Sequence, residues 1–537
     1  MQRILIPLVF VCAFSANAQI SAELFVDGKA QDRIEFKDSI QFVRHLKDLQ
    51  LRWLNDGYYF SGIDSLIERG APTFVYLHKG DRLKVNLPDF RGKKLPKFLS
   101  EQLKEFANNG YPFASIYLDS TRLSDRILTG KLMISPGPEI RYDSSYFFET
   151  PKTNRSYIFQ LLDIVPGELF SEKDYRLIGQ KIERSSFLSL GRPTDLSFKD
   201  NRAKVFLDIQ ESTSSSFQGV LGLQQVQAGK TVAVGSIDLD LQNLFRSGKE
   251  FQLHWERFSE ESQSLNLFYK HPFFLESKLA PSFRFDLLKQ DTTFITRKTG
   301  LGLHTFISPR SELFLEFERT NGSLLSTDLE TIVSSGLADF TRNIYGLQLS
   351  KGRASSLGVL KEGVVWKGAI SAGRKNINRN LSLPDSYYDT IQAETNFYRL
   401  EAILMYQKRL MKRQAFFHRI ESGFLQNDEL LTNELYRLGG LNSMRGFNEK
   451  SIFAERYLLS RAEFRSFFEN NSFAYVFYDQ LIYTSGNISD QPYGLGLGFA
   501  LATSAGQFSF ALAVGDSDAQ AISFSTMKIH FGYVSKF

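Results

Sequence analysis

A regular alternation of apolar and polar residues through positions 215–537 constrains this chain most. Phe473, Tyr475 and Phe477, for example, are separated by single residues, and apolar residues at every second position are typical of strands with one apolar face. About sixteen such segments allow ~20 residues for each strand and its connection. The pattern favours a transmembrane barrel of about sixteen antiparallel strands. A large soluble β-sandwich or propeller is the alternative.

The connections between these segments differ in length in an alternating way. Long connections fall near residues 320–339, 374–393, 425–453 and 483–492, whereas turns such as Leu244–Gly248 are short. Short turns at one rim and long loops at the other are typical of outer-membrane barrels. An even strand count returns both ends of the barrel to the rim with the short turns, so we expect the preceding residues to lie in the periplasm.

Composition agrees with many half-buried strands. The chain has 49 Phe and 22 Tyr, yet its mean hydropathy is only -0.22, and aromatic residues favour strands. No apolar run after the N-terminus approaches the ~20 residues of a spanning helix. The net charge of +5 in 537 residues gives no reason to expect a nucleic-acid partner.

The final segment shows the alternation most clearly. Phe531, Tyr533 and Phe537 fall on one face with Ile529, and polar residues or glycine occupy most positions between them. An aromatic face opposite a polar face suits a strand that faces lipid on one side and the lumen on the other. We therefore expect Phe531, Tyr533 and Phe537 to belong to the last barrel strand.

The first 18 residues resemble a secretory signal peptide. Arg3 precedes the apolar run Ile4–Phe14, and Ala16–Ala18 forms a small-residue cleavage site before Gln19. An uncleaved anchor is the alternative. Cys12 is the only cysteine, so we expect the mature chain to have no disulfide and no thiolate metal site. The seven histidines show no metal-binding spacing, and we expect no cofactor.

The region between residues 19 and 214 contains an internal repeat. The pattern GYxFxxI begins at Gly57 and again at Gly110, 53 residues later. Each copy follows an amphipathic helix, over Ile40–Trp53 and Leu95–Phe106, and each glycine is placed to end that helix. A third, longer unit begins at Ile140, with a helix expected over Ser171–Phe187. Every unit has the order strand, helix or helices, strand, strand, which suggests an array of modules rather than one α+β domain.

A motif near residue 445 points to a family. Arg445-Gly446-Phe447 lies in the loop between the eleventh and twelfth expected strands, Glu463 lies in the next strand, and Asp479 ends an F-x-D in the following one. Together with the modules, this pattern resembles the BamA/TamA outer-membrane assembly-factor superfamily, which also contains two-partner secretion transporters. Met444 stands where that family usually has Val or Ile. The resemblance covers essentially the whole mature chain.

The resemblance implies both domains and function. It implies a signal peptide (1–18), three POTRA-like modules (19–79, 80–137 and 138–214) and an outer-membrane barrel (215–537). It implies a protein that receives unfolded or extended clients in the periplasm and inserts or passes them, with outer-membrane lipids and accessory periplasmic or lipoprotein subunits as further partners. A two-partner secretion transporter for one dedicated client, or a passive porin or adhesin, is the alternative. We expect no enzyme, because GxSxG and HExxH are absent.

The resemblance also implies that the loop carrying Arg445, called loop six, folds into the barrel. A cation in a confined lumen is costly unless it is paired, and a guanidinium can bind two carboxylates through its planar fork. We therefore expect Arg445 to pair with Glu463, Asp479 or both, with Gly446 allowing a tight turn before Phe447. These five residues are the predicted lumen lock. An ordinary solvated loop arginine is the alternative.

Overall fold

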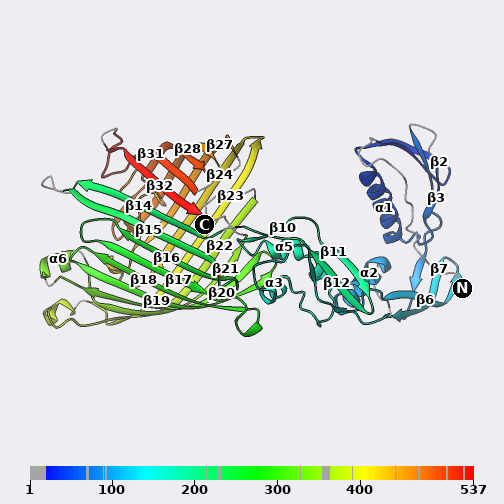
Figure 1. The fold of residues 1–537 in the computed structure, drawn as a ribbon, viewed down its shortest axis with the longest axis horizontal. Coiled ribbons are helices and arrows are strands. Elements are labelled where there is room, and N and C mark those ends of the chain that lie inside the picture. The colour runs from blue at the N-terminus through cyan, green and yellow to red at the C-terminus, as the bar shows by residue number, and fades with distance from the viewer. Residues whose placement is uncertain are drawn as a thin grey trace. The chain divides into compact units, whose positions relative to one another are not determined.

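The computed structural model describes residues 20–67, 72–88, 90, 94–212, 214–225, 231–326, 328–334, 336–352, 363–389, 391–441, 443–469, 472–503, 506–523 and 526–536 (Figure 1). The expected signal peptide and Phe537 lie outside these residues. The chain divides into two compact units, the first made of Met1–Tyr146, Ile164–Arg176 and Asp195–Phe206, and the second of the remainder. No helix in the described ranges is long and apolar enough to cross a membrane.

The first repeat packs one helix against a four-stranded sheet. Helix α1 (Ser39–Asn55) begins where the Asp38 carboxylate accepts a hydrogen bond from the backbone N–H of Gln41, at 2.7 Å. Phe42, Leu46 and Trp53 on its inner face are buried with the sheet residues. The predicted amphipathic helix is confirmed, but Ile40 and Val43, which the periodicity placed on the apolar face, are exposed. The sheet has the order β2-β1-β4-β3, and its strands are β1 (Ile20–Val26), β2 (Lys29–Phe36), β3 (Gly62–Ile67) and β4 (Thr73–His78).

The second repeat has the same plan with three strands. Helix α2 (Leu95–Asn108) begins with Pro96 near its N-terminus, where a missing N–H costs nothing. The sheet has the order β5-β7-β6, so β6 forms an edge. Its strands are β5 (Lys84–Asn86), β6 (Ser115–Ser124) and β7 (Ile127–Ser135).

The third repeat contributes residues to both units. A sheet of order β11-β12-β8 and helix α4 fall in the first unit, whereas α3, α5, β10 and β13 fall in the second. The expected helix over Ser171–Phe187 is wrong in one respect: it is two short helices, because its halves pack in different units. The elements are β8 (Arg141–Tyr142), β9 (Tyr146–Phe147), α3 (Arg155–Leu162), α4 (Glu172–Arg176), α5 (Ile178–Ile182), β10 (Leu188–Leu190), β11 (Asp195–Lys199), β12 (Arg202–Leu207) and β13 (Ile209–Glu211).

The three repeats share one sheet topology, which confirms the internal repeat. In each, the first strand lies parallel to the last strand: β1 to β4, β5 to β7 and β8 to β12. The last strand in turn pairs antiparallel with the strand before it. The division into compact units does not follow the predicted limits at residues 79, 137 and 214, so those module boundaries stay predictions.

The repeated glycine has the same backbone role in both copies. Gly57 and Gly110 follow α1 and α2 with φ of 96° and 93°, a conformation that favours glycine. The Gly57 carbonyl accepts a hydrogen bond from the Leu83 N–H (2.9 Å), and the Gly110 carbonyl accepts one from the Ile140 N–H (2.7 Å). Leu83 and Ile140 directly precede the first strands of the following repeats. Each glycine therefore ends a helix and ties its module to the next one.

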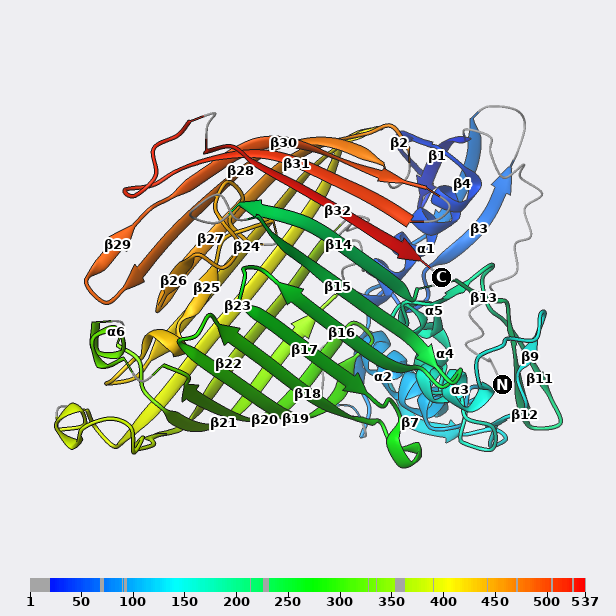
Figure 2. The same cartoon turned by 60° about the vertical axis from the view of Figure 1, so that its left-hand side comes forward.

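The barrel is one antiparallel sheet in which β14 pairs with β32 (Figure 2). Neighbours along the chain are neighbours in the sheet, apart from the small hairpin β25–β26. The strands are β14 (Ser216–Gln225), β15 (Thr231–Leu244), β16 (Lys249–Arg257), β17 (Gln263–Lys270), β18 (Leu279–Gln290), β19 (Phe294–Ser308), β20 (Ser311–Leu324), β21 (Phe340–Lys351), β22 (Gly363–Ile377), β23 (Glu394–Met411), β24 (Gln414–Gln426), β27 (Arg456–Phe467), β28 (Phe473–Ser485), β29 (Ile488–Asp490), β30 (Tyr493–Ala502), β31 (Gly506–Asp516) and β32 (Lys528–Lys536).

The described part of the chain thus has seventeen strand elements in the barrel sheet where about sixteen are predicted. The difference arises because β29 pairs with the end of β28 and β30 pairs with the rest of β28. The two are one strand interrupted near Pro492. The expected long loop at 483–492 is therefore wrong, since most of it continues the β28–β29 hairpin.

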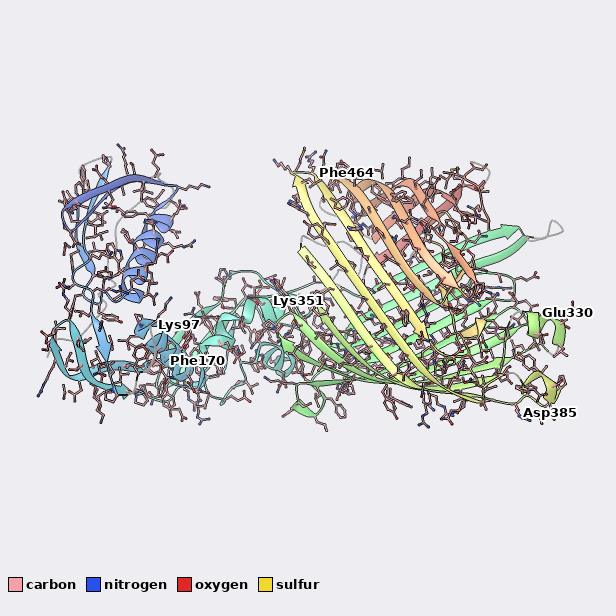
Figure 3. The ribbon with its side chains drawn as sticks, turned by 180° about the vertical axis from the view of Figure 1, so that it is seen from behind. Lys97, Phe170, Glu330, Lys351, Asp385 and Phe464 are labelled. Atoms are coloured by element: carbon pink, nitrogen blue, oxygen red, sulfur yellow. The ribbon has the colours of Figure 1, made fainter. Side chains whose placement is uncertain are left out.

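Most of the other loops agree with the predicted asymmetry. The connection after β20 carries helix α6 (Leu329–Ser334), and the connection after β22 carries the 3-10 helix Asp385–Tyr387. Figure 3 shows Glu330 and Asp385 at one rim of the barrel and Lys351 at the opposite rim. Most connections at the rim of Lys351 are short, but the one between β21 and β22 spans residues 352–362 and departs from the predicted pattern. Phe464 points outward from β27 and is exposed, as expected for the face toward lipid.

Candidate functional site

Loop six, residues 427–455, lies between β24 and β27. It contains the 3-10 helix Thr432–Glu434 and the hairpin of β25 (Tyr436–Leu438) with β26 (Ile452–Ala454). Met444 is fully buried in an apolar cluster that also contains residues of β27 and β28. The flexible methionine side chain fills this space where a branched residue is more usual in the resembled family. The cluster anchors the loop against the inner wall beside its charged tip.

The sequence register of β27 and β28 brings two acids to one place on this wall. Arg461 pairs with Asp479, and Glu463 pairs with Phe477. Because side chains alternate between the faces of a strand, Glu463 and Asp479 lie diagonally on the same face. Both are buried.

The structure brings Arg445 between these two acids. Its Nε and Nη2 donate to the two carboxylate oxygens of Asp479 at 2.7 and 2.6 Å, and its Nη1 donates to Glu463 Oε1 at 2.8 Å. The backbone N–H of Arg445 also donates to Asp479 Oδ2, at 3.3 Å. The guanidinium carbon lies 3.7 Å from the ring centroid of Phe477. Arg445 is 1% exposed and Asp479 is 0% exposed, so this is a buried ion triad.

Burial and pairing act on Arg445 in opposite directions. Burial alone would lower the pKa of its guanidinium, but hydrogen bonds to Asp479 and the charges of both acids raise the pKa above its ordinary value. The arginine therefore stays charged in the lumen. Charge-assisted bidentate bonds are among the strongest polar contacts in proteins.

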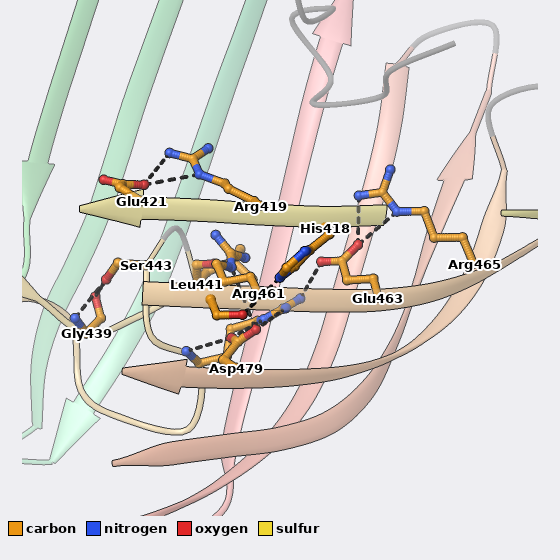
Figure 4. A network of polar contacts seen from close by, with 12 residues as sticks. His418, Arg419, Glu421, Gly439, Leu441, Ser443, Arg461, Glu463, Arg465 and Asp479 are labelled. Atoms are coloured by element: carbon orange, nitrogen blue, oxygen red, sulfur yellow. Dashed lines mark hydrogen bonds and ion pairs between the residues drawn. The ribbon is translucent and has the colours of Figure 1, made fainter. Parts of the chain in front are cut away.

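Two further arginines belong to the site and were missed from the sequence (Figure 4). Arg465 donates from Nε to Glu463 Oε2 at 2.8 Å, and Arg461 donates from Nη2 to the backbone carbonyl of Leu441 at 3.2 Å. The signal was present, because Arg461, Glu463 and Arg465 are spaced two apart and so share a strand face. Loop six is therefore held through its backbone as well as through Arg445.

Gly446 and Phe447 pack against β31. Gly446 has φ of 93°, and a Cβ on it would lie 2.8 Å from the Val514 carbonyl. The Phe447 ring lies directly over Gly515, where a Cβ would be 2.6 Å from the ring. On β30, Gly494 leaves space for the Arg445 carbonyl in the same way. Small residues on β30 and β31 therefore let the tip of loop six approach the wall.

A second charged contact holds the base of loop six. Glu434 accepts hydrogen bonds from Arg342 Nη1 at 3.0 Å and from Lys375 Nζ at 2.8 Å. All three side chains are at most 3% exposed. Sequence reasoning missed this contact, because nothing local relates residue 434 to β21 and β22. At the tip the loop supplies the cation, whereas at the base the loop supplies the anion.

The predicted residues of the last strand lie apart from this site. Phe531 and Tyr533 belong to β32, whose described residues pair with β31. Phe537 lies outside the described residues. Among the described residues, no group of His, Cys, Asp or Glu could hold a metal ion.

The comparisons with known proteins concern the fold. No family model matches the chain, and no curated protein matches it. Solved structures match: CdiB from Acinetobacter baumannii is 12% identical with a TM-score of 0.53, covering 92% of this chain and 98% of that chain. CdiB from Escherichia coli is 12% identical with a TM-score of 0.53, covering 100% and 94%. BamA from Haemophilus ducreyi lacking POTRA domains 1-3 is 14% identical with a TM-score of 0.45, covering 83% and 94%. The chain therefore has the fold of the CdiB barrels.

Proposed function

We propose that this chain is an outer-membrane protein that receives extended client proteins through its N-terminal modules and inserts or passes them through its barrel. The buried triad of Arg445, Glu463 and Asp479, which holds loop six inside a barrel of the CdiB fold, carries this proposal. The proposal assigns no catalytic residue and no cofactor. Outer-membrane lipids surround the barrel, and periplasmic or lipoprotein subunits assist it.

Loop six argues against a passive pore. It leaves the wall after β24, touches β21 and β22 through Glu434, and reaches β18 where Arg437 donates to Gln290 at 2.7 Å. Its tip then contacts β27 and β28 through Arg445. A loop fastened to the wall at these distant strands obstructs the lumen, whereas a porin keeps its lumen open to water.

The modules offer a strand edge to a client. Strand β6 ends the sheet of the second repeat, and Tyr117 and Leu123 on it are each 54% exposed. An unpaired edge accepts an extended chain by main-chain hydrogen bonds, and apolar side chains beside it add specificity. This edge suits an unfolded client, which still has free backbone donors and acceptors.

Site-specific crosslinking tests the proposal. A photoreactive amino acid at position 117 should capture nascent outer-membrane or secreted proteins. The same residue at position 104, exposed on α2 of the same repeat, should capture far fewer. Many captured clients indicate an assembly factor, whereas one captured client indicates a dedicated transporter. Equal capture at both positions would contradict the role of β6, and a large steady conductance in planar bilayers would indicate a porin.

A further inference from the structure

The barrel has a short seam between its first and last strands. The described residues of β14 and β32 pair at three positions, Ser216–Lys536, Phe217–Ser535 and Gln218–Val534. On its other side, β14 pairs with β15 along its whole length, from Ser216 to Gln225. The seam is therefore the place where the fewest main-chain hydrogen bonds hold the wall together, and other contacts across it matter most.

Loop six contacts the wall on one side of this seam through Gly446. The Gly446 backbone lies against the Val514 carbonyl of β31, the strand next to β32. The Gln520 side chain, in the connection between β31 and β32, donates to the Gly446 carbonyl at 3.3 Å and to the Gly515 carbonyl at 3.1 Å. On this side of the seam, loop six is therefore held by its backbone, which packs closely against β31.

Four residues later, loop six contacts the other side of the seam through Lys450. Its Nζ donates to Glu256 Oε2 of β16 at 2.7 Å and to Ser264 Oγ of β17 at 2.9 Å. Glu256 also lies 3.7 Å from His254 Nε2, and the other ring nitrogen of His254 bonds Asp238 of β15. Lys450 therefore joins a polar chain that continues to the strand next to β14.

The distances along the wall agree with a span across the seam. From β31 to β16 the sheet order passes β32, β14 and β15, which is four strand spacings of ~4.8 Å, or roughly 19 Å along the wall. The four steps from Gly446 to Lys450 reach at most ~14 Å, and the lysine side chain extends farther. Residues 446, 447, 449 and 450 lie in turns and a bend rather than in an extended strand. The lysine side chain therefore supplies the remaining reach across β32, β14 and β15 to its partners on β16 and β17.

We propose that residues 446–450 form an inner strap across the seam, and that the Lys450–Glu256 ion pair is its releasable end. The Lys450 side chain is 24% exposed and that of Glu256 17%, whereas Arg445 is 1% exposed and held by two acids. An ion pair between a partly solvated ammonium and one carboxylate is much weaker than a buried bidentate pair. Breaking the weak end leaves loop six attached at Arg445 but frees the seam to open.

Single-channel recording in planar bilayers tests the strap without any client. Lys450→Met removes the charge and keeps an unbranched side chain, and we expect transient openings about fivefold more frequent than in the wild type. Glu256→Gln should have the same effect, and the double variant should be no worse than either single one. Lys351→Met, at an exposed lysine at the other end of β21 from the loops, is the matched control and should behave as wild type.

A disulfide across the seam shows where the openings occur. Cysteines at positions 218 and 534, paired residues of β14 and β32, are introduced with Cys12→Ser so that they are the only thiols in the chain. In the Lys450→Met background, oxidation should abolish the additional openings and reduction should restore them. Openings that persist in the oxidised protein, or a Lys450→Met trace identical to wild type, would overturn the strap.

The inference rests on the proposed membrane barrel but not on its clients. If the wild-type protein forms no membrane-inserted species at all, the proposed function fails. The strap is then tested in detergent by the rate at which a maleimide labels a cysteine at position 218. Faster labelling in the Lys450→Met variant supports the strap, and an unchanged rate overturns it.

Discussion

Arg445 and Asp479 meet in a fork-to-fork contact, in which Nε and Nη2 of the arginine donate to the two carboxylate oxygens at 2.7 and 2.6 Å. The contact joins residues 34 positions apart, one in a loop and one in a strand of the wall. Both side chains are buried, so neither charge has water as a substitute partner. The position of loop six in the lumen therefore depends on this one pairing more than on any exposed ion pair of the loops.

We expect Arg445→Ala to loosen loop six while the barrel still inserts. The change leaves the carboxylates of Asp479 and Glu463 without the arginine in a confined site. This loss costs ~3–5 kcal/mol of stability when the site is dry and less when water enters. Arg445→Lys should rescue only in part, because an ammonium lacks the planar fork. Limited proteolysis of loop six and client insertion measure the effect.

Double-mutant cycles assign the loss to its partners. Arg445→Ala is combined in turn with Asp479→Ala and with Glu463→Ala. We expect a coupling free energy in both cycles, and a larger one for Asp479, because Asp479 accepts two side-chain hydrogen bonds from Arg445. The exposed pair Arg379–Asp385 is the control and should couple by less than ~1 kcal/mol. Coupling near zero in both test cycles would show that Arg445 is not a lock.

Glu434→Gln should release the base of loop six independently of its tip. Arg342 and Lys375 then lose the charge that both contact, and two buried cations repel each other without it. We expect a fall in the temperature at which the folded band on a semi-native gel is lost. Asp428→Asn, an exposed residue of the same loop, is the control. Equal shifts in the two variants would mean that the base contact contributes nothing specific.

Gly57→Ala and Gly110→Ala should each destabilise the modules. Both glycines have positive φ, and an added Cβ would lie 3.0 Å from the Leu83 carbonyl oxygen and 2.9 Å from a Leu169 methyl group, respectively. A left-handed conformation alone costs an alanine on the order of 1 kcal/mol. At Gly80 φ is also positive, but nothing lies within 4 Å of an added Cβ. Gly80→Ala should therefore show the conformational cost alone, as measured by proteolysis of residues 20–211 in the intact protein.

Glu449 should make loop six more stable at lower pH. Burial, and next the charge of Glu256, raise the pKa of Glu449 from its ordinary 4.5 to about 7, against the opposing effects of Lys450, the Leu441 backbone and His254. Because the folded state holds this proton more tightly, stability falls as pH rises from about 4.5 to about 7. Glutamine is neutral at every pH. We therefore expect the free energy of unfolding of Glu449→Gln to be higher than that of the wild type by on the order of 1 kcal/mol at pH 8.

The same measurement near pH 5 provides the control. Wild-type Glu449 is mostly protonated there in the folded protein, so the advantage of Glu449→Gln should shrink. The temperature of heat-induced mobility change, compared between the two proteins at pH 5, 7 and 8, gives the difference directly. An advantage of Glu449→Gln that does not vary with pH would reject the titration of Glu449 as its cause.

Local patterns determined much of this protein. Apolar alternation predicted the barrel strands, because a strand exposes one face to each side whatever its neighbours are. Helical periodicity and Gly57 and Gly110 predicted α1, α2 and their ends for a similar reason, since caps and amphipathic faces act within a few residues. Arg445, Glu463 and Asp479 could be chosen because their motif resembles that of a known barrel family, although their role stays a prediction.

Only the tertiary structure decided which distant residues meet. Glu434 contacts Arg342 and Lys375, and Lys450 contacts Glu256, nearly 200 positions away in the sequence. These contacts form because the curvature of the sheet determines which strands of the wall lie next to loop six. The break between α4 and α5 and the split of one strand into β29 and β30 likewise follow from packing against other elements. A sequence records periodicity along the chain, but the partner of a charge inside a barrel is determined by strand register and closure, which depend on every strand at once.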